Sequence, residues 1–245
     1  MEEIFMDFLN KTVVITGASV GIGKATSIEF AKGGANVCIV DIDPVGLEAT
    51  ENEIKAFGVN VSAYICDVSD EARVREVAAD ITKKYGSIDI LVNNAGLWRG
   101  AKPFVESSSD EWKKRIGVNI LGLMYFTHEV LPGMIEKRYG RVINVGSVAG
   151  VYGIQNMADY SMTKGAVSSF TKALAKEVAA VGITVNNVVP GSVRNEGAAK
   201  ETDMSYMNRR GELEEYAYLI CFLASDKAAY ISGQDYQIDG CRRKN

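Results

Sequence analysis

Three side chains that can together transfer a proton lie close to one another in the chain. Ser147 is the first of them, and it follows an apolar run that is typical of a buried strand. Tyr160 and Lys164 are four residues apart in a helical pattern that covers residues 159–180, so their side chains share one face of the helix. Because an ammonium group favours the phenolate form of a nearby phenol, the stretch predicts a site for acid–base chemistry.

The pKa shift that Lys164 would have to cause is physically reasonable. A free tyrosine titrates near pH ~10, so lowering the pKa of Tyr160 to about 7 requires roughly 4 kcal/mol. One unit charge at ~4 Å supplies about 4 kcal/mol at an effective dielectric constant of ~20. A Tyr-x-x-x-Lys pair also arises by chance about once in a chain of this composition, so the pair alone is not diagnostic.

A glycine-rich segment near the start of the chain predicts a phosphate-binding turn. Residues 12–16 form a β-branched run, and an amphipathic helix pattern follows the glycines and ends near residues 33–34. Gly17, Gly21 and Gly23 carry no Cβ, which lets the backbone turn tightly and approach a pyrophosphate at the helix N-terminus. An ordinary turn between a strand and a helix is the alternative.

An acid follows the second predicted strand, residues 37–40. This acid, Asp41, stands 18 residues after Gly23. An acid at this position can bond the hydroxyls of the adenosine ribose, which favours NAD over NADP. The alternative is a turn acid or a helix cap before Pro44. Asp41 is therefore the predicted selector of the cofactor.

Further motifs accompany these residues and connect the chain with a family. They are Thr16-Gly17-Ala18-Ser19-Val20-Gly21-Ile22-Gly23, Asn93-Asn94-Ala95-Gly96, Asn119 and Pro190-Gly191. Together with Ser147, Tyr160 and Lys164, their order and spacing resemble the short-chain dehydrogenase/reductase family over nearly the whole chain. The resemblance implies one NAD-binding domain, residues 1–245, with a short substrate lid at about residues 196–210.

Predicted strands and helices alternate along the chain. Strands are expected at residues 12–16, 37–40, 61–65, 88–92, 142–145, 183–189 and 236–238, and helices after the glycine turn and at 44–57, 71–85, 110–137, 159–180 and 213–224. This alternation predicts an α/β Rossmann fold with a doubly wound parallel sheet. The resemblance implies seven strands with helices on both faces.

The resemblance assigns catalytic roles to four side chains. Tyr160 would exchange the proton of the reacting hydroxyl, and Ser147 would bond the reacting oxygen. Lys164 would favour phenolate and bond the ribose, and Asn119 would kink its helix and hold a water that relays protons to Lys164. Read without the family, Asn119 is a polar side chain in a helix interior, which can equally be structural.

The resemblance also implies which residues bind NAD. Asp67 and Val68 match the adenine-binding pair of the family, and the segment after residue 92 would brace the sheet and line the cleft. The predicted cofactor-binding residues are Gly17, Ser19, Val20, Gly21, Ile22, Gly23, Asp41, Ile42, Asp67, Val68, Asn94, Ala95, Gly96, Tyr160, Lys164, Pro190, Gly191, Val193 and Asn195.

Bulky apolar side chains fall in segments that line the substrate cleft of the family. With Ser147 and Tyr160, the predicted substrate residues are Trp98, Tyr152, Met157, Met204 and Met207. They suggest a roomy apolar pocket and favour a bulky alcohol such as a hydroxysteroid or a bile acid over a short diol. The alternative is ordinary packing, which is what methionine and aromatic residues mostly do.

Three positions depart from the pattern of the family. Asn195 stands where a threonine usually holds the nicotinamide amide, Leu213 where a proline usually opens a helix, and Cys241 where a glycine usually ends the last turn. Since asparagine can still donate and accept hydrogen bonds, these departures affect the placement of the nicotinamide more than the activity. The short basic tail after Cys241 is expected to be solvated.

The sequence thus predicts an NAD-dependent alcohol dehydrogenase or carbonyl reductase. The main alternative is an NADPH-dependent 3-oxoacyl-[acyl-carrier-protein] reductase, which would need an arginine near Val20 or Ile42 and a basic patch for the carrier. Arg194, Arg209 and Arg210 are the only candidates for such a basic patch. A non-catalytic NAD-binding scaffold or redox sensor is a distant alternative, because it would not need the catalytic side chains.

Composition excludes several other classes of protein. The net charge of −4 gives no reason to expect nucleic acid, and the four cysteines form no pair with metal or redox spacing. No bound metal is expected, and His128 has no carboxylate placed to orient it for catalysis. The chain begins without a signal-peptide pattern and has no membrane-spanning run, so a cytoplasmic protein is expected. By resemblance it would be a homotetramer, with contacts through the helices that start near residues 110 and 159.

Overall fold

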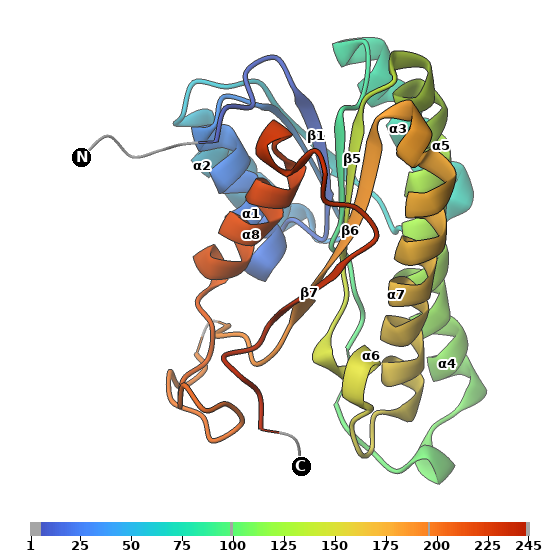
Figure 1. The fold of residues 1–245 in the computed structure, drawn as a ribbon, viewed down its shortest axis with the longest axis vertical. Coiled ribbons are helices and arrows are strands. Elements are labelled where there is room, and N and C mark those ends of the chain that lie inside the picture. Colours follow the sequence, from blue (N-terminus) through green and yellow to red (C-terminus); the bar gives the residue numbers. More distant parts are fainter. Residues whose placement is uncertain (1–5, 99, 196, 244–245) are drawn as a thin grey trace.

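The structure is a computed structural model that describes residues 6–98, 100–195 and 197–243. Its centre is a parallel sheet of seven strands in the order β3-β2-β1-β4-β5-β6-β7 (Figure 1). The strands are β1 Thr12–Thr16, β2 Asn36–Asp41, β3 Val61–Ile65, β4 Ile90–Asn93, β5 Gly140–Val145, β6 Ile183–Pro190 and β7 Asp235–Ile238. The predicted seven-stranded Rossmann fold is confirmed.

Helices cover both faces of the sheet. Figure 1 shows α1, α2 and α8 on one side and α3, α4, α5 and α7 on the other. Their bounds are α1 Gly21–Lys32, α2 Pro44–Lys55, α3 Glu71–Tyr85, α4 Ser109–Ile116, α5 Leu123–Lys137, α6 Val148–Tyr152, α7 Ala158–Val178 and α8 Leu213–Ala224. Single turns of 3-10 helix are η1 Phe104–Glu106, η3 Ala179–Val181 and η4 Asp226–Ala228, and η2 Gly117–Gly122 is a π-helix.

Both faces of the central strands are buried. Every residue of β1, β4, β5 and β6 is buried, as expected for a parallel sheet between two helical layers. Val13 and Ile15 point into the apolar core under α1 and α8, whereas Val14 points into the core under α3 and α5. The near-continuous apolar runs of the sequence therefore follow from burial on two sides.

The chain changes its winding direction between β1 and β4. These strands pair with each other, while β2 and β3 extend the sheet on one side and β5 to β7 on the other. Because the loops after β1 and β4 leave toward opposite helical layers, a crevice opens at the carboxyl ends of these strands. The candidate site lies at this edge.

The helix predicted at residues 110–137 is divided in the structure. The first part, α4, begins after Ser108, whose side chain forms a capping box with Glu111. The π-helix at Gly117–Gly122 then separates α4 from α5. Such a turn adds a residue to the helical repeat and often marks a functional position, and here it contains Asn119.

The described part of the C-terminal tail, Arg242 and Arg243, is partly buried, whereas a solvated tail was expected. Tyr206 and Met207 donate backbone hydrogen bonds to the carbonyls of Cys241 and Gly240 at 3.0 and 3.2 Å. Arg243 donates from its backbone to Met204 at 2.9 Å, and its guanidinium lies 5.0 Å from the ring of Tyr206. The predicted lid, of which residue 196 lies outside the described residues, is thus joined to the tail over residues 204–207.

Two of the departures from the family pattern have a structural account. Leu213 opens α8 without a proline because Glu212 and Glu215 form a reciprocal capping box. Cys241 has a φ of 57°, in the left-handed region that favours glycine. None of the helices in the described parts of the chain is long and apolar enough to cross a membrane.

Candidate active site

Ser147 is placed by the junction between β5 and α6. It is the N-cap of α6, and its Oγ accepts a hydrogen bond of 3.1 Å from the backbone N–H of Ala149. This bond uses a lone pair of the hydroxyl and leaves its proton available for another acceptor. A short helix thereby fixes a hydroxyl that can donate toward the crevice.

Tyr160 and Lys164 lie on the first turns of α7, beside α6. The two helices approach closely at Gly150, where a Cβ would lie only 2.4 Å from the carbonyl carbon of Lys164. Gly150 therefore allows the contact that brings Ser147 next to Tyr160. Both side chains line one hollow together with Lys164, as the sequence predicted.

Lys164 is held deep in the protein. Only 5% of the residue is exposed, and its Nζ donates a hydrogen bond of 2.7 Å to the carbonyl of Val145. Burial lowers the pKa of Lys164 to about 8, because the interior disfavours the charged form. The Nζ lies 6.0 Å from the centre of the Tyr160 ring.

The pKa of Tyr160 differs from the expectation. Burial raises it, while the Ser147 hydroxyl and the charge of Arg115 lower it to a smaller extent. Lys164 is not among the groups that shift this pKa, so the predicted lowering to about 7 is not found. The reason is that desolvation of the phenolate outweighs the nearby favourable groups. The side chain that supplies the positive charge is Arg115, which forms a buried ion pair with Asp159.

Asn119 lies inside the π-helix and is almost fully buried. Its Oδ1 accepts from the backbone N–H of Leu97 at 2.6 Å, and its Nδ2 donates to the carbonyl of Leu97 and to the Thr163 hydroxyl at 3.2 and 3.1 Å. These bonds tie the loop after β4 to α7 beside Lys164. Asn119 therefore has a structural role, and the water relay stays a prediction.

The glycine turn has the geometry that a dinucleotide phosphate requires. Gly17 has a φ of 66°, and a Cβ there would lie 2.8 Å from the Cα of Ala95. Asn94 Nδ2 donates to the carbonyls of Thr16 and Gly17 at 2.9 Å, which joins the turn to the end of β4. Because α1 begins without a side-chain cap, its first N–H groups are available to an anion.

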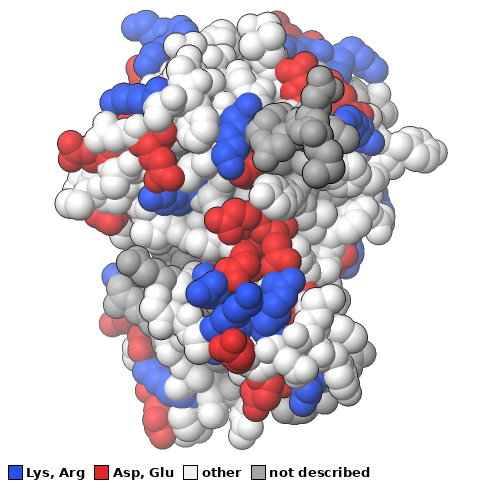
Figure 2. Space-filling view, turned by 90° about the vertical axis from the view of Figure 1, so that its left-hand side faces the viewer, with Lys and Arg blue, Asp and Glu red and all other residues white. Residues whose placement is uncertain are grey.

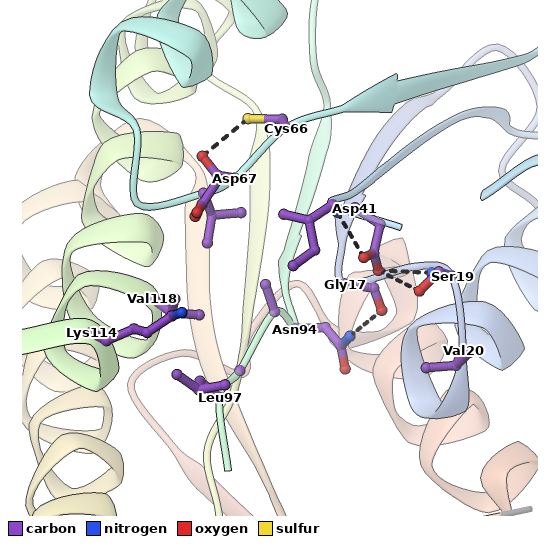
Figure 3. A pocket seen from close by; sticks show the side chains of 14 residues that line it. Gly17, Ser19, Val20, Asp41, Cys66, Asp67, Asn94, Leu97, Lys114 and Val118 are labelled. Atoms are coloured by element: carbon purple, nitrogen blue, oxygen red, sulfur yellow. Dashed lines mark hydrogen bonds between the residues drawn. The ribbon is translucent and has the colours of Figure 1, made fainter. Parts of the chain in front are cut away.

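A hollow of about 420 Å³ extends from this turn along the carboxyl ends of the strands (Figure 3). It has a size typical of a site for a small molecule. The residues that line it are Gly17, Ser19, Val20, Asp41, Ile42, Cys66, Asp67, Val68, Asn94, Ala95, Gly96, Leu97, Lys114 and Val118. The predicted adenosine-binding residues are therefore gathered in one place, and the glycines Gly21 and Gly23 shape the turn beside it.

Asp41 lines this hollow and is also a turn acid. Its Oδ2 accepts from the backbone N–H and the hydroxyl of Ser19 at 3.0 and 2.7 Å, and its Oδ1 accepts from the backbone of Ile42 and Asp43 at 2.7 and 3.1 Å. The two interpretations of Asp41 are thus compatible. The turn fixes the carboxylate at the edge of the hollow, and its binding to a ribose stays a prediction.

A second hollow of about 270 Å³ continues from the first one to the catalytic side chains. Asn94 and Gly96 border both hollows. The second is lined by Ile22, Asn94, Gly96, Val145, Gly146, Ser147, Tyr160, Lys164, Pro190, Gly191, Val193 and Asn195. A nicotinamide dinucleotide fits this arrangement. The glycine turn, which can bind its phosphates, lies between Asp41, which can bind the adenosine ribose, and Tyr160, which can transfer a proton.

Sequence reasoning missed several residues of the two hollows. Cys66 directly precedes Asp67, and Leu97 directly follows Gly96. Their positions beside predicted motifs could have indicated that they line the hollow. Lys114 and Val118 are four residues apart and share the helix face that meets the hollow, which the predicted uninterrupted helix did not indicate. Val145 ends β5, and Gly146 follows it directly before Ser147.

The predicted apolar substrate residues do not line the two hollows described above. Trp98, Tyr152, Met157 and Met204 line neither of the two hollows, and Met207 lines a separate one of about 330 Å³ near Cys241. Trp98 is 55% exposed, and the Tyr152 hydroxyl donates to Gln237 at 2.7 Å. Trp98, Met204 and Met207 come from loops, whose positions depend on distant contacts rather than on local pattern, whereas Tyr152 ends α6 and Met157 directly precedes α7.

Other candidate groups lie outside the site. The side chain of His128 is 83% exposed and lies beside Glu129. Among the described residues, no group of three His, Cys, Asp or Glu side chains is placed to hold a metal ion. The side chains of Ser147, Tyr160 and Lys164 bring a hydroxyl, a phenol and an amine to one hollow.

The arginines considered for an acidic carrier are largely paired. Arg194 lies 3.0 Å from a carboxylate oxygen of Glu212, and Arg209 donates to both carboxylate oxygens of Glu215 at 2.7 Å. The face in Figure 2 carries a small group of basic side chains with acidic ones directly beside it. It offers no uninterrupted basic surface.

Comparison with known sequences relates this arrangement to established enzymes. The family described as short chain dehydrogenase matches residues 11–205. The chain is 40% identical over 238 residues to the 3-oxoacyl-[acyl-carrier-protein] reductase FabG of Thermotoga maritima, covering 94% of this chain and 96% of the relative. It is 35% identical over 247 residues to FabG of Escherichia coli K12, covering 96% and 98%.

Two solved structures match the fold of this chain over most of its length. NAD+-bound xylitol dehydrogenase superposes with a TM-score of 0.90 at 29% identity, covering 95% of this chain and 99% of the other. Levodione reductase superposes with a TM-score of 0.90 at 32% identity, covering 95% and 97%. Sequence and fold match these relatives over nearly the whole length, and the chain belongs to the short-chain dehydrogenase family.

Proposed function

We propose that the chain is an NAD(H)-dependent ketone reductase that acts on 3-oxoacyl thioesters. The names of the relatives that match its whole length support this substrate class. The hydroxysteroid reading has less support, because the apolar side chains on which it rests do not form one pocket. The carboxylate of Asp41 in the adenosine hollow supports NAD(H) rather than NADP(H).

The observation that carries the proposal is the placement of Ser147 and Tyr160 at the end of the cofactor cleft. A bound nicotinamide supplies the hydride. Ser147 donates its free proton as a hydrogen bond to the carbonyl oxygen of the substrate, where negative charge develops. Tyr160, whose pKa is raised, is protonated at neutral pH and transfers its proton to that oxygen. Lys164 lies near the phenol, and its Nζ is held in place by a hydrogen bond to the carbonyl of Val145.

The substrate class is tested by following NADH oxidation with three ketones of different shape. We expect kcat/KM for an acetoacetyl thioester to exceed that for a ketosteroid and for a short ketose by at least about tenfold, since contacts to the thioester act in the transition state. The acetoacetyl group is presented on carrier protein, on coenzyme A and on cysteamine. A higher kcat/KM for the ketosteroid would contradict the proposal and restore the hydroxysteroid reading.

The raised pKa of Tyr160 predicts opposite pH profiles for the two directions of reaction. Reduction needs the phenol, so its kcat/KM should be constant through neutral pH and fall in alkaline solution. Oxidation needs the phenolate, so its kcat/KM should rise with pH, by up to about tenfold per unit. Initial rates in both directions across one buffer series check this. An oxidation rate that is already maximal at acidic pH would contradict it.

Association into a homotetramer is also part of the proposed function. Met124 and Ile135 on α5 and Met162 on α7 are exposed, and apolar side chains on neighbouring helices support a subunit contact there. A monomeric mass by light scattering at micromolar concentration would exclude this assembly.

A further inference from the structure

Lys114 occupies a position in the cofactor cleft that the sequence did not indicate. It lies in the last turn of α4 and lines the hollow that contains Asp41 and Asp67. Figure 3 shows its ammonium nitrogen pointing toward the hollow beside Val118, across from Val20 and the glycine turn. Its ammonium group forms neither a hydrogen bond nor an ion pair with the residues that the structure describes.

The position of Lys114 is fixed by close packing at the π-helix. A Cβ at Gly122 would lie 2.6 Å from the Cγ2 of Val68, and a Cβ at Gly117 would lie 3.3 Å from the Cβ of Ser69. These glycines hold the helix against the loop that follows β3. The ammonium group is therefore kept on the same wall of the hollow as Asp67.

The surroundings of Lys114 suit a flat base with acceptor atoms. Val68 and Val118 provide apolar surface, and Asp67 provides carboxylate oxygens, one of which accepts from Ser69 at 2.9 and 2.7 Å. Lys114 is the one lysine or arginine among the described residues that line this hollow. Adenine combines ring nitrogens that accept with an exocyclic amine that donates, so a cation beside a carboxylate matches its edge.

The phosphates of a dinucleotide have other partners in this cleft. The pyrophosphate belongs at the uncapped start of α1. The ribose belongs at Asp41, which Ser19 holds in place. In Figure 3, Lys114 lies on the wall opposite to both, which leaves the base as its ligand.

We propose that Lys114 is a further cofactor-binding residue that donates a hydrogen bond to the adenine ring of NAD(H). This inference rests on the proposed use of NAD(H). The ammonium group anchors the adenosine half of the cofactor from α4, whereas the glycine turn and Asp41 hold it from the other wall.

The experiment compares Lys114→Met with Lys113→Met. Lys113 is the matched control, because its side chain is 76% exposed, lies near Asp110 and lines neither hollow. The Kd values of NADH, NADPH and reduced nicotinamide mononucleotide are measured by fluorescence titration with the parent and both variants. The mononucleotide lacks the adenosine half and so reports on the other half of the cleft.

We expect Lys114→Met to raise the Kd of NADH about tenfold, the value of one hydrogen bond to a charged group. The Kd of the mononucleotide should stay within about twofold, because this ligand has no adenine for Lys114 to contact. Lys113→Met should change neither value, because Lys113 makes no contact to the base.

Three results would overturn the proposal. An unchanged Kd of NADH in Lys114→Met would show that Lys114 does not contact the cofactor. An equal rise in the Kd of the mononucleotide would indicate a general charge effect. A larger rise in the Kd of NADPH than of NADH would assign the ammonium group to a phosphate. A parent that does not bind NADH would instead refute the proposed function, and this inference with it. A parent that binds NADH, with Lys114→Met unaltered, refutes this inference alone.

Discussion

Tyr160→Phe should lower kcat for ketone reduction by about 100- to 10,000-fold, the range that a positioned acid or base contributes. The substitution removes the transferable proton and keeps the ring. Tyr160 is partly buried and lines the hollow together with Ser147, so phenylalanine fills the same space, and loss of a hydroxyl whose main partner is Ser147 should leave the fold intact. Because Tyr160 borders only the nicotinamide end of the cleft, the Kd of NADH should stay within about threefold of the parent value.

Stopped-flow and steady-state rates at saturating NADH measure this effect. Tyr218→Phe is the matched control, since Tyr218 is 51% exposed on α8, away from the cleft, and its kcat should equal that of the parent. If Tyr160→Phe retains more than about a tenth of the parent kcat, proton transfer does not depend on this phenol. Lys164 or a solvent path would then have to replace it.

The regular parts of the fold could be predicted because their residues are buried in a repeating pattern. The strands at residues 12–16 and 61–65 and the helices at 71–85 and 213–224 agree with the structure. The helix predicted at 44–57 ends at Lys55, where burial of its apolar face ends. The strand predicted at 88–92 comprises Ile90–Asn93. Such shifts are small because the sheet register fixes each strand.

The parts that could not be predicted depend on contacts between distant segments. Asn119 lies in a π-helix because its side chain bonds Leu97 and Thr163, and helical periodicity contains no sign of either. Lys164 is buried by the end of β5, which lowers its own pKa, and burial likewise raises the pKa of Tyr160. A helix-face argument gives the spacing of two groups but not their solvation. The same limit applies to the apolar residues of the loops.

The cofactor cleft was predictable because its residues follow strand ends. Asp41, Asp67 and Asn94 each end or follow a parallel strand, and parallel strands present their carboxyl ends at one edge. Lys114 was not predicted because it comes from a helix, α4, that reaches the same edge from another direction. Motif order thus identifies the residues that strand ends contribute to a cleft, whereas the residues that helices contribute depend on how the helices pack.

Cofactor preference should reverse when the charge beside the ribose is reversed. In the parent, NADP(H) would place a phosphate near the carboxylate of Asp41, and two like charges at ~4 Å repel by about 4 kcal/mol at an effective dielectric constant of ~20. At about 1.4 kcal/mol per decade this approaches a thousandfold. Solvent reduces it, so we expect the parent to prefer NADH over NADPH by about ten- to several hundred-fold in kcat/KM.

The double variant Asp41→Ala, Ile42→Arg should favour NADPH. Ile42 is 65% exposed beside the hollow, so an arginine there can reach a phosphate, and its planar fork matches the phosphate oxygens. Removal of the carboxylate also frees the N–H and hydroxyl of Ser19, which now donate to Asp41, to bind the same phosphate. The ratio of kcat/KM values for NADPH and NADH should rise by at least about a hundredfold, because repulsion is replaced by attraction.

Asp43→Ala is the matched control for this change. It removes a carboxylate two residues away that caps α2 through the N–H of Val45 at 3.1 Å and lines neither hollow. It should cost about 1 kcal/mol of stability and leave the cofactor ratio unchanged. A parent that uses NADPH as well as NADH, or a double variant with an unaltered ratio, would mean that Asp41 serves only the turn. The four hydrogen bonds that it accepts would then be its whole function.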